Sequence, residues 1–185
     1  REVYRGIKNN PMIHHNLNGS LKYIEKGKSF KIEDFQITPF HVPHDSQDNV
    51  GYYIEFDGQR LTLATDVGNI TDEVAHYMTK ANHLIIESNY DEEMLKNGSY
   101  PSYLKERITC GTGHISNREA AEFLANNFSS QLRNIWLCHL SGDNNNPELA
   151  YNTISEALTT KGVNIGKDVE LHVLGRNILS AKTIF

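Results

Sequence analysis

The chain has 185 residues, of which 38% are hydrophobic and 22% are charged, so it can form one domain with a real core but not two. Its net charge of −5 excludes a protein that is basic over its whole surface, although a local basic strip for nucleic acid is still compatible with it. No apolar run of about 18 residues is present, and Cys110 and Cys138 lie outside any Cys-x-x-Cys pattern. These features predict a cytoplasmic protein with reduced thiols and no membrane partner.

Residues 1–20 are polar and rich in turn formers, with no lasting hydrophobic period. We expect an irregular arm over 1–20 and a folded domain over 21–185. Alternating or continuous apolar runs predict the strands of this domain at 21–24, 35–40, 52–56, 60–65, 83–87, 134–138, 169–173 and 178–184. Asp57-Gly58 predicts a tight hairpin turn between the third and the fourth of these strands.

Helices are expected between the later strands. Thr71 and the capping box from Ser116 to Glu119 mark two helix starts, and Pro147 takes the first position of another helix. Two shorter helical pieces are expected within 91–109. A hairpin followed by alternating strands and helices is typical of a layered α/β domain.

Polar side chains stand where several predicted strands end. His44 and Asp45 follow the second strand, Asp66 follows the fourth and His139 follows the sixth. The loops at strand ends form the ligand crevice of α/β sheets, and imidazole and carboxylate are ligands that suit Zn, Mn or Fe. A single residue of this kind is more often a surface or turn residue, so the metal site is predicted from their coincidence.

The local sequences around these residues resemble known motifs. Thr-Pro-Phe-His-Val-Pro-His44-Asp-Ser and Ala-Thr-Asp66-Val-Gly resemble the third and fourth motifs of metallo-β-lactamase-fold hydrolases. Gly-His114-Ile-Ser-Asn and Leu-Cys-His139-Leu-Ser resemble the end of the tRNase Z-like branch. With Glu87-Ser-Asn-Tyr-Asp added, the order and spacing are similar to those of the YycJ/VicX (WalJ) group, from about residue 28 to the end.

This resemblance implies an α/β fold, the metallo-β-lactamase αββα sandwich. It also implies a cytoplasmic bacterial hydrolase with two divalent metal ions, Zn or Mn, that acts as a phosphodiesterase or nuclease on nucleic acid. By the same resemblance His44 binds one metal, His139 binds the other and Asp66 bridges them, while His114 is the general acid for the leaving oxygen. Glu87 at its strand end could orient a ligand histidine.

Further polar residues could contact the substrate. Ser141, Asn144 and Asn145 could donate hydrogen bonds to phosphate, but capping of the following helix explains the two asparagines equally well. Lys105 and Arg107 form a basic pair close in sequence to the expected general acid, and they could also contact a phosphate.

The superfamily signature His-x-His-x-Asp-His does not occur in this sequence. The signature supplies two ligands to each metal, so each metal would retain one histidine and a share of Asp66, whereas tight zinc sites use at least three protein ligands. We therefore expect an N-terminally truncated, C-terminal part of the sandwich that binds metal weakly or not at all and is inactive alone. Its incomplete first β-layer should leave an apolar face uncovered, which favours self-association.

Two other functions stay open. A hydrolase of the same fold could act on a small phosphodiester or ester, and the acidic net charge is compatible with that. A non-catalytic binding domain of the same fold is the other alternative. It would have no physical need for four polar groups at one crevice, namely His44, Asp66, His114 and His139.

Overall fold

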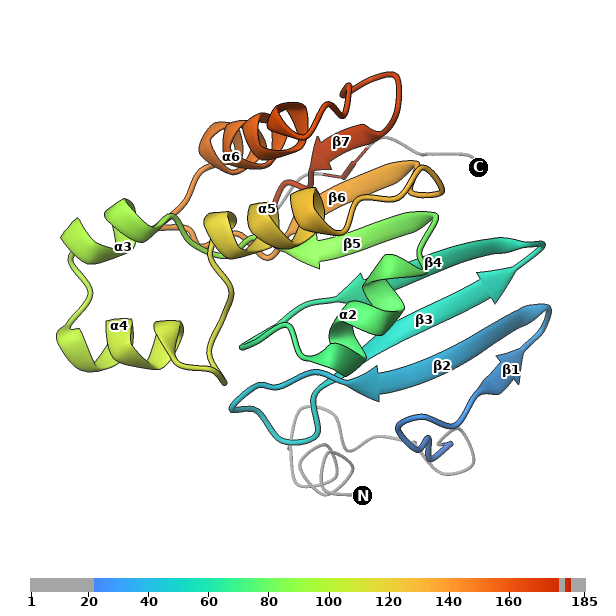
Figure 1. Cartoon of the computed structure of the whole chain (residues 1–185). Helices are drawn as coiled ribbons and strands as arrows, with labels where there is room; N and C mark the ends of the chain where they lie inside the picture. Colours follow the sequence, from blue (N-terminus) through green and yellow to red (C-terminus); the bar gives the residue numbers. More distant parts are fainter. Residues whose placement is uncertain (1–21, 177–178, 181–185) are drawn as a thin grey trace.

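Seven strands form one mixed sheet in the computed structural model, which describes residues 22–176 and 179–180 (Figure 1). The strands lie side by side in chain order: β1 (Phe30–Ile32), β2 (Phe35–His41), β3 (Val50–Phe56), β4 (Gln59–Ala64), β5 (His83–Glu87), β6 (Asn134–Cys138) and β7 (Glu170–Val173). The pairs from β1 to β4 are antiparallel and those from β4 to β7 are parallel. The layered α/β class is confirmed.

Helices connect the parallel strands. The described residues contain α2 (Asp72–Thr79), α3 (Glu92–Asn97), α4 (Ser102–Thr109), α5 (Asn117–Asn126) and α6 (Pro147–Thr160). In Figure 1, α2 and α5 lie over one face of the sheet with α6 beside α5, whereas α3 and α4 stand beyond the end toward which β4 and β5 point. No helix in this part of the chain is long and apolar enough to cross a membrane.

The predicted hairpin turn and helix starts are confirmed. Asp57 and Gly58 both have positive φ, 46° and 73°, as a two-residue hairpin turn that matches the strand twist requires. The Ser116 side chain accepts a hydrogen bond from the backbone N–H of Glu119, and the Glu119 carboxylate accepts one from the backbone N–H of Ser116. Asn146 caps α6 ahead of a proline at its first position. Such caps stabilise a helix by about 1 kcal/mol each.

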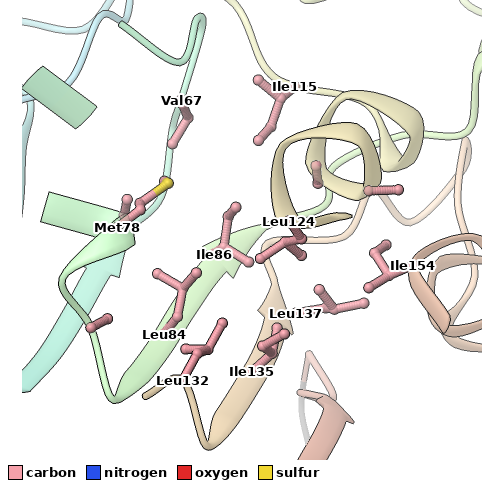
Figure 2. Close-up of a cluster of buried hydrophobic side chains, with 14 of the residues drawn as sticks. Val67, Met78, Leu84, Ile86, Ile115, Leu124, Leu132, Ile135, Leu137 and Ile154 are labelled. Atoms are coloured by element: carbon pink, nitrogen blue, oxygen red, sulfur yellow. The ribbon is translucent and has the colours of Figure 1, made fainter. Parts of the chain in front are cut away.

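The core lies between the sheet and these helices (Figure 2). Leu84 and Ile86 of β5 and Leu137 of β6 point toward Leu124 of α5 and Ile154 of α6, and each of these side chains is almost fully buried. Burial of one such side chain contributes about 1.5–3 kcal/mol. This packing fixes the ends of β5 and β6, where the polar residues of the candidate site begin.

One expected strand, over 21–24, was not found where it was predicted. Residues 22–24 have no regular structure, and the first strand of the sheet begins instead at Phe30. The 22–24 segment fails as a strand because Tyr23 and Ile24 are exposed and have no pairing partner in the sheet. The expected arm over 1–20 and most of the expected strand 178–184 lie outside the described residues.

The sheet face opposite the helices carries an apolar row. Tyr52, Leu63, Ile85, Trp136 and His172 are register partners on successive strands, and they point away from the helices because side chains alternate along a strand. The described part of the chain contains this one sheet and not the second sheet of a sandwich. Self-association through this face stays a prediction, which the molar mass in solution tests.

Candidate active site

Four strands direct polar residues to the same edge of the sheet. β4, β5 and β6 are parallel, and β2 runs in the same direction because two antiparallel pairings separate it from β4. His44 follows β2, Asp66 follows β4, Glu87 ends β5 and His139 follows β6. The loop between α4 and α5 brings His114 to this group. The sheet topology therefore assembles residues that are far apart in sequence.

The Asp66 carboxylate lies between two imidazoles. Its Oδ1 is 3.5 Å from Nε2 of His44 and 3.7 Å from Nε2 of His139. The His114 ring is adjacent to both of these histidines, with ring centroids 4.9 Å from that of His44 and 5.2 Å from that of His139. The arrangement places a carboxylate where it can be shared by two metal ions, each with one imidazole.

Every imidazole of this group is oriented through its Nδ1. His44 Nδ1 is 2.9 Å from the carbonyl oxygen of Gly113, His114 Nδ1 is 3.1 Å from Glu87 Oε1, and His139 Nδ1 is 2.8 Å from Glu87 Oε2. A carbonyl or carboxylate oxygen only accepts, so each Nδ1 carries the proton and donates. In the neutral ring the lone pair is then on Nε2, as metal-binding histidines require. The donor set fits divalent zinc or manganese.

Glu87 is the buried residue whose hydrogen bonds connect several parts of the site. Its side chain is fully buried and accepts hydrogen bonds from the two histidines and from the backbone N–H groups of Asp66, Val67 and Ile115. Burial raises the pKa of this carboxyl, but the hydrogen bonds from His114 and His139 and their charges outweigh burial and lower it. The hydrogen bond between Glu87 and His139 raises the pKa of His139.

Asp66, Glu87, His114 and His139 form a possible metal-binding group, since one ligand atom of each lies within 4.8 Å of the others. The five donors around Glu87 occupy its two oxygens, which favours an orienting role for it over direct binding. Asp66 and His139 also have left-handed backbone conformations, with φ of 54° and 57°. Such conformations cost about 1–3 kcal/mol each and occur both in tight turns, as at Asp57, and at functional sites.

Two glycines allow the loops around His44 to pack closely. A Cβ on Gly113 would lie 2.2 Å from the carbonyl oxygen of Ile108, and a Cβ on Gly68 would lie 2.5 Å from the backbone of Thr112. Because Gly113 supplies the carbonyl that holds His44 Nδ1, the close approach also sets the orientation of that imidazole.

Gly113→Ala should therefore lower the free energy of unfolding by about 1–3 kcal/mol, because an overpacked backbone contact must move apart. Urea denaturation followed by tryptophan fluorescence measures this change. Gly111→Ala is the matched control in the same loop, since a Cβ there meets no atom within 4 Å. An equal effect of both substitutions would contradict the packing argument.

A cavity of about 730 Å³ opens in front of the imidazoles, a size typical of ligand sites. His44, Asp45, His114, His139 and Ser141 line it. Asp45 forms an ion pair with Arg107, which lowers the pKa of Asp45 through their hydrogen bond. Ser141 thus lies where a phosphate contact was predicted, and its role stays a prediction.

The two predicted asparagines lie behind the cavity wall. Asn145 is buried, and its amide donates to the backbone carbonyls of Ser88 and Asn89. Asn144 is 1% exposed, and within the described residues its side chain has no hydrogen-bond partner. Neither lines the cavity. Their placement favours bracing of the loop that precedes α6 over direct phosphate contact, which stays untested.

Other residues differ from the expected set. Lys105 donates to the backbone carbonyls of Lys96 and Gly98 and does not line the cavity, whereas Arg107 does. Asn89 and Arg176 were not predicted as site residues from the sequence. The Asn89 side chain donates to the carbonyl of His139 over 2.8 Å, and Arg176 lines the cavity. Asn89 lies within the Glu87-Ser-Asn-Tyr-Asp motif but was given no role there, whereas Arg176 stands in no motif.

Both cysteines are free thiols, as expected. Cys110 is exposed, and its hydrogen bond with Thr112 lowers its pKa. Cys138 is buried beside His139, and burial raises its pKa to about 12. No disulfide contributes to the fold in the described part of the chain.

Comparison with known proteins places this geometry in a family. A sequence model described as a Beta-lactamase superfamily domain matches residues 2–131. The chain is 37% identical over 139 residues to Exodeoxyribonuclease YycJ of Bacillus anthracis, which covers 75% of this chain and 53% of that protein. It is 34% identical over 157 residues to Exodeoxyribonuclease WalJ of Streptococcus pneumoniae, which covers 84% and 58%.

The fold is also similar to that of a solved structure, Zn(2+)-bound PqqB from Methylobacterium extorquens. The TM-score is 0.60 at 17% identity, and the match covers 92% of this chain and 57% of that one. The chain spans between half and three-fifths of the length of the curated relatives that it matches. The chain belongs to the metallo-β-lactamase superfamily and is a homologue of the YycJ and WalJ exodeoxyribonucleases.

Proposed function

We propose that this chain carries half of the active site of a metal-dependent phosphodiesterase that degrades DNA. The observation that supports this most strongly is the convergence of two imidazole Nε2 atoms on Asp66 Oδ1, at 3.5 and 3.7 Å, with each Nδ1 already engaged. The relatives named as exodeoxyribonucleases support DNA as the substrate.

The residues have distinct roles in this proposal. His44 would bind one metal, His139 the other, and Asp66 would bridge them. Divalent metal ions held by these residues would supply Lewis-acid chemistry, namely activation of a water and neutralisation of charge on the phosphate. Glu87 holds both His114 and His139 in the required tautomer through their Nδ1 atoms.

His114 is proposed to donate a proton from Nε2 to the leaving oxygen. The hydrogen bond from Nδ1 to the buried Glu87 carboxylate, over 3.1 Å, orients this ring so that Nε2 is the atom available to donate. After the transfer the ring keeps its Nδ1 proton and stays oriented by the same hydrogen bond. Ser141, which lines the cavity, would donate to the phosphate.

The proposed site needs ligands from outside these 185 residues. One imidazole and half of a shared carboxylate per metal fall short of the three protein ligands that tight zinc sites use. The missing ligands correspond to the His-x-His-x-Asp-His signature, which the chain lacks. We propose that the chain forms the C-terminal part of the αββα sandwich and that it binds metal weakly and is inactive alone.

Hydrolysis assays test this function. A longer protein that joins this chain to a segment with the signature should degrade end-labelled DNA in the presence of Mn²⁺, while the 185-residue chain should not. RNA and a chromogenic phosphodiester assayed in parallel separate a DNase from an RNase and from an enzyme for small diesters. Hydrolysis by the chain alone at the rate of the longer protein would contradict the proposal, as would an inactive longer protein that holds its full metal.

A further inference from the structure

Two arginines, Arg107 and Arg176, line the cavity together with the imidazoles. Arg107 of α4 forms an ion pair with Asp45, the residue directly after His44. Arg176, which follows β7, donates from Nη2 to the carbonyl oxygen of Leu140, the residue directly after His139, over 2.8 Å. The His114 ring is adjacent to both of the other imidazoles. One guanidinium therefore lies next to His44 and the other next to His139.

Each guanidinium is oriented by one contact and keeps other donors. Arg107 uses Nε toward Asp45, and Arg176 uses Nη2 toward Leu140. The remaining N–H groups of the two guanidiniums have no hydrogen-bond acceptor among residues 22–176 and 179–180. The side chain of Arg107 is 63% exposed, so a ligand can reach it. A guanidinium with two free N–H groups is suited to bind a phosphate with both of them.

The chain as a whole is acidic, with a net charge of −5. The two oriented guanidinium groups at the cavity therefore attract an anionic ligand locally, which the overall negative charge of the protein does not do. A small diester that sits over the imidazoles has no second phosphate for either arginine. A polynucleotide has a phosphate on each side of an internal bond, and on each side of its terminal bond when that end is phosphorylated. It can therefore offer one phosphate to the arginine near His44 and another to the arginine near His139.

We infer that Arg107 and Arg176 are positioning residues that bind the backbone phosphates flanking the scissile bond. The site then takes a single strand of a polynucleotide rather than a small phosphodiester. This inference rests on the proposed phosphodiesterase function, whose catalytic groups are His44, Asp66, His114 and His139. The ion pair with Asp45 sets the direction of the Arg107 fork rather than serving only to hold α4.

Binding of a fluorescein-labelled oligothymidylate by the 185-residue chain tests this inference. Fluorescence anisotropy is measured in EDTA at several salt concentrations, so that neither metal nor cleavage contributes. Arg107→Gln and Arg176→Gln should each weaken binding about tenfold. The logarithm of the association constant falls linearly with the logarithm of the salt concentration. Each variant should reduce the magnitude of this slope by about 0.7, the value for one lost phosphate contact on a single strand.

Arg118→Gln is the matched control, because Arg118 is an exposed helix arginine that pairs with Glu92 outside the cavity. It should leave the salt slope unchanged, and Arg→Lys variants at the two test positions should restore it. Unchanged slopes in both test variants, an equal loss in Arg118→Gln, or no binding by the unmodified chain at about 10⁻⁴ M would overturn the inference. Because the assay needs no hydrolysis, its failure and that of the proposed function are distinguishable.

Discussion

Glu87→Gln is expected to lower the free energy of unfolding by about 3 kcal/mol, which is the largest effect on stability that we expect from a substitution in the site. The carboxylate is fully buried and accepts from His114, His139 and three backbone N–H groups. A glutamine places an NH₂ donor against some of these donors, so at least one of them loses its acceptor in a buried position. Urea denaturation followed by tryptophan fluorescence measures the change.

The matched control is Glu122→Gln on the exposed face of α5. It should change the free energy of unfolding by less than about 0.5 kcal/mol, as is usual for an exposed position. The structural explanation fails if Glu87→Gln and Glu122→Gln are equally mild, because the five donors would then not depend on the carboxylate.

Asp66→Asn should reduce the affinity of the chain for Zn²⁺ by at least about 100-fold, since loss of residues that only support ligands already costs about 10- to 100-fold. The substitution removes the charge that lies between His44 Nε2 and His139 Nε2. An amide of the same size leaves the packing in place, so the effect reports on charge. Calorimetric titration with Zn²⁺ measures the weak binding of the parent chain and its loss.

Asp34→Asn is the control, because Asp34 is exposed in the turn between β1 and β2, at the opposite end of β2 from His44. The Zn²⁺ affinity of the Asp34→Asn variant should equal that of the parent chain. His114→Ala separates the two roles open to that residue: a general acid can be removed with little change in Zn²⁺ affinity, whereas a ligand cannot. A similar affinity in the Asp66 and Asp34 variants would show that Zn²⁺ binds elsewhere.

Local signals in the sequence predicted much of the architecture. The Asp57-Gly58 turn and the Ser116–Glu119 capping box depend on neighbouring residues, so their chemistry can be read from short segments. The positions of His44, Asp66 and His139 after predicted strands also indicated one shared edge, and the structure brings them together. Strand direction is enough for this, because parallel strand ends meet in space.

Residues whose roles depend on contacts across the fold could not be assigned in the same way. Asn144 and Asn145 stand in a run of asparagines before a proline, and the sequence does not tell whether either of them faces a cavity. Their burial follows from how the loop packs under α3 and against the end of β5. Arg176 reaches the site only because β7 lies beside β6, so no sequence neighbour of His139 indicated it.

The metal content of the purified 185-residue chain after exhaustive dialysis tests the central claim most directly. In the proposed function His44, Asp66 and His139 form half of a two-metal site. Elemental analysis should then find well under one Zn or Mn ion per chain, while a longer protein with the His-x-His-x-Asp-His signature should retain about two. About two ions retained by this chain alone would contradict the account, because the described ligands would then be sufficient without further donors.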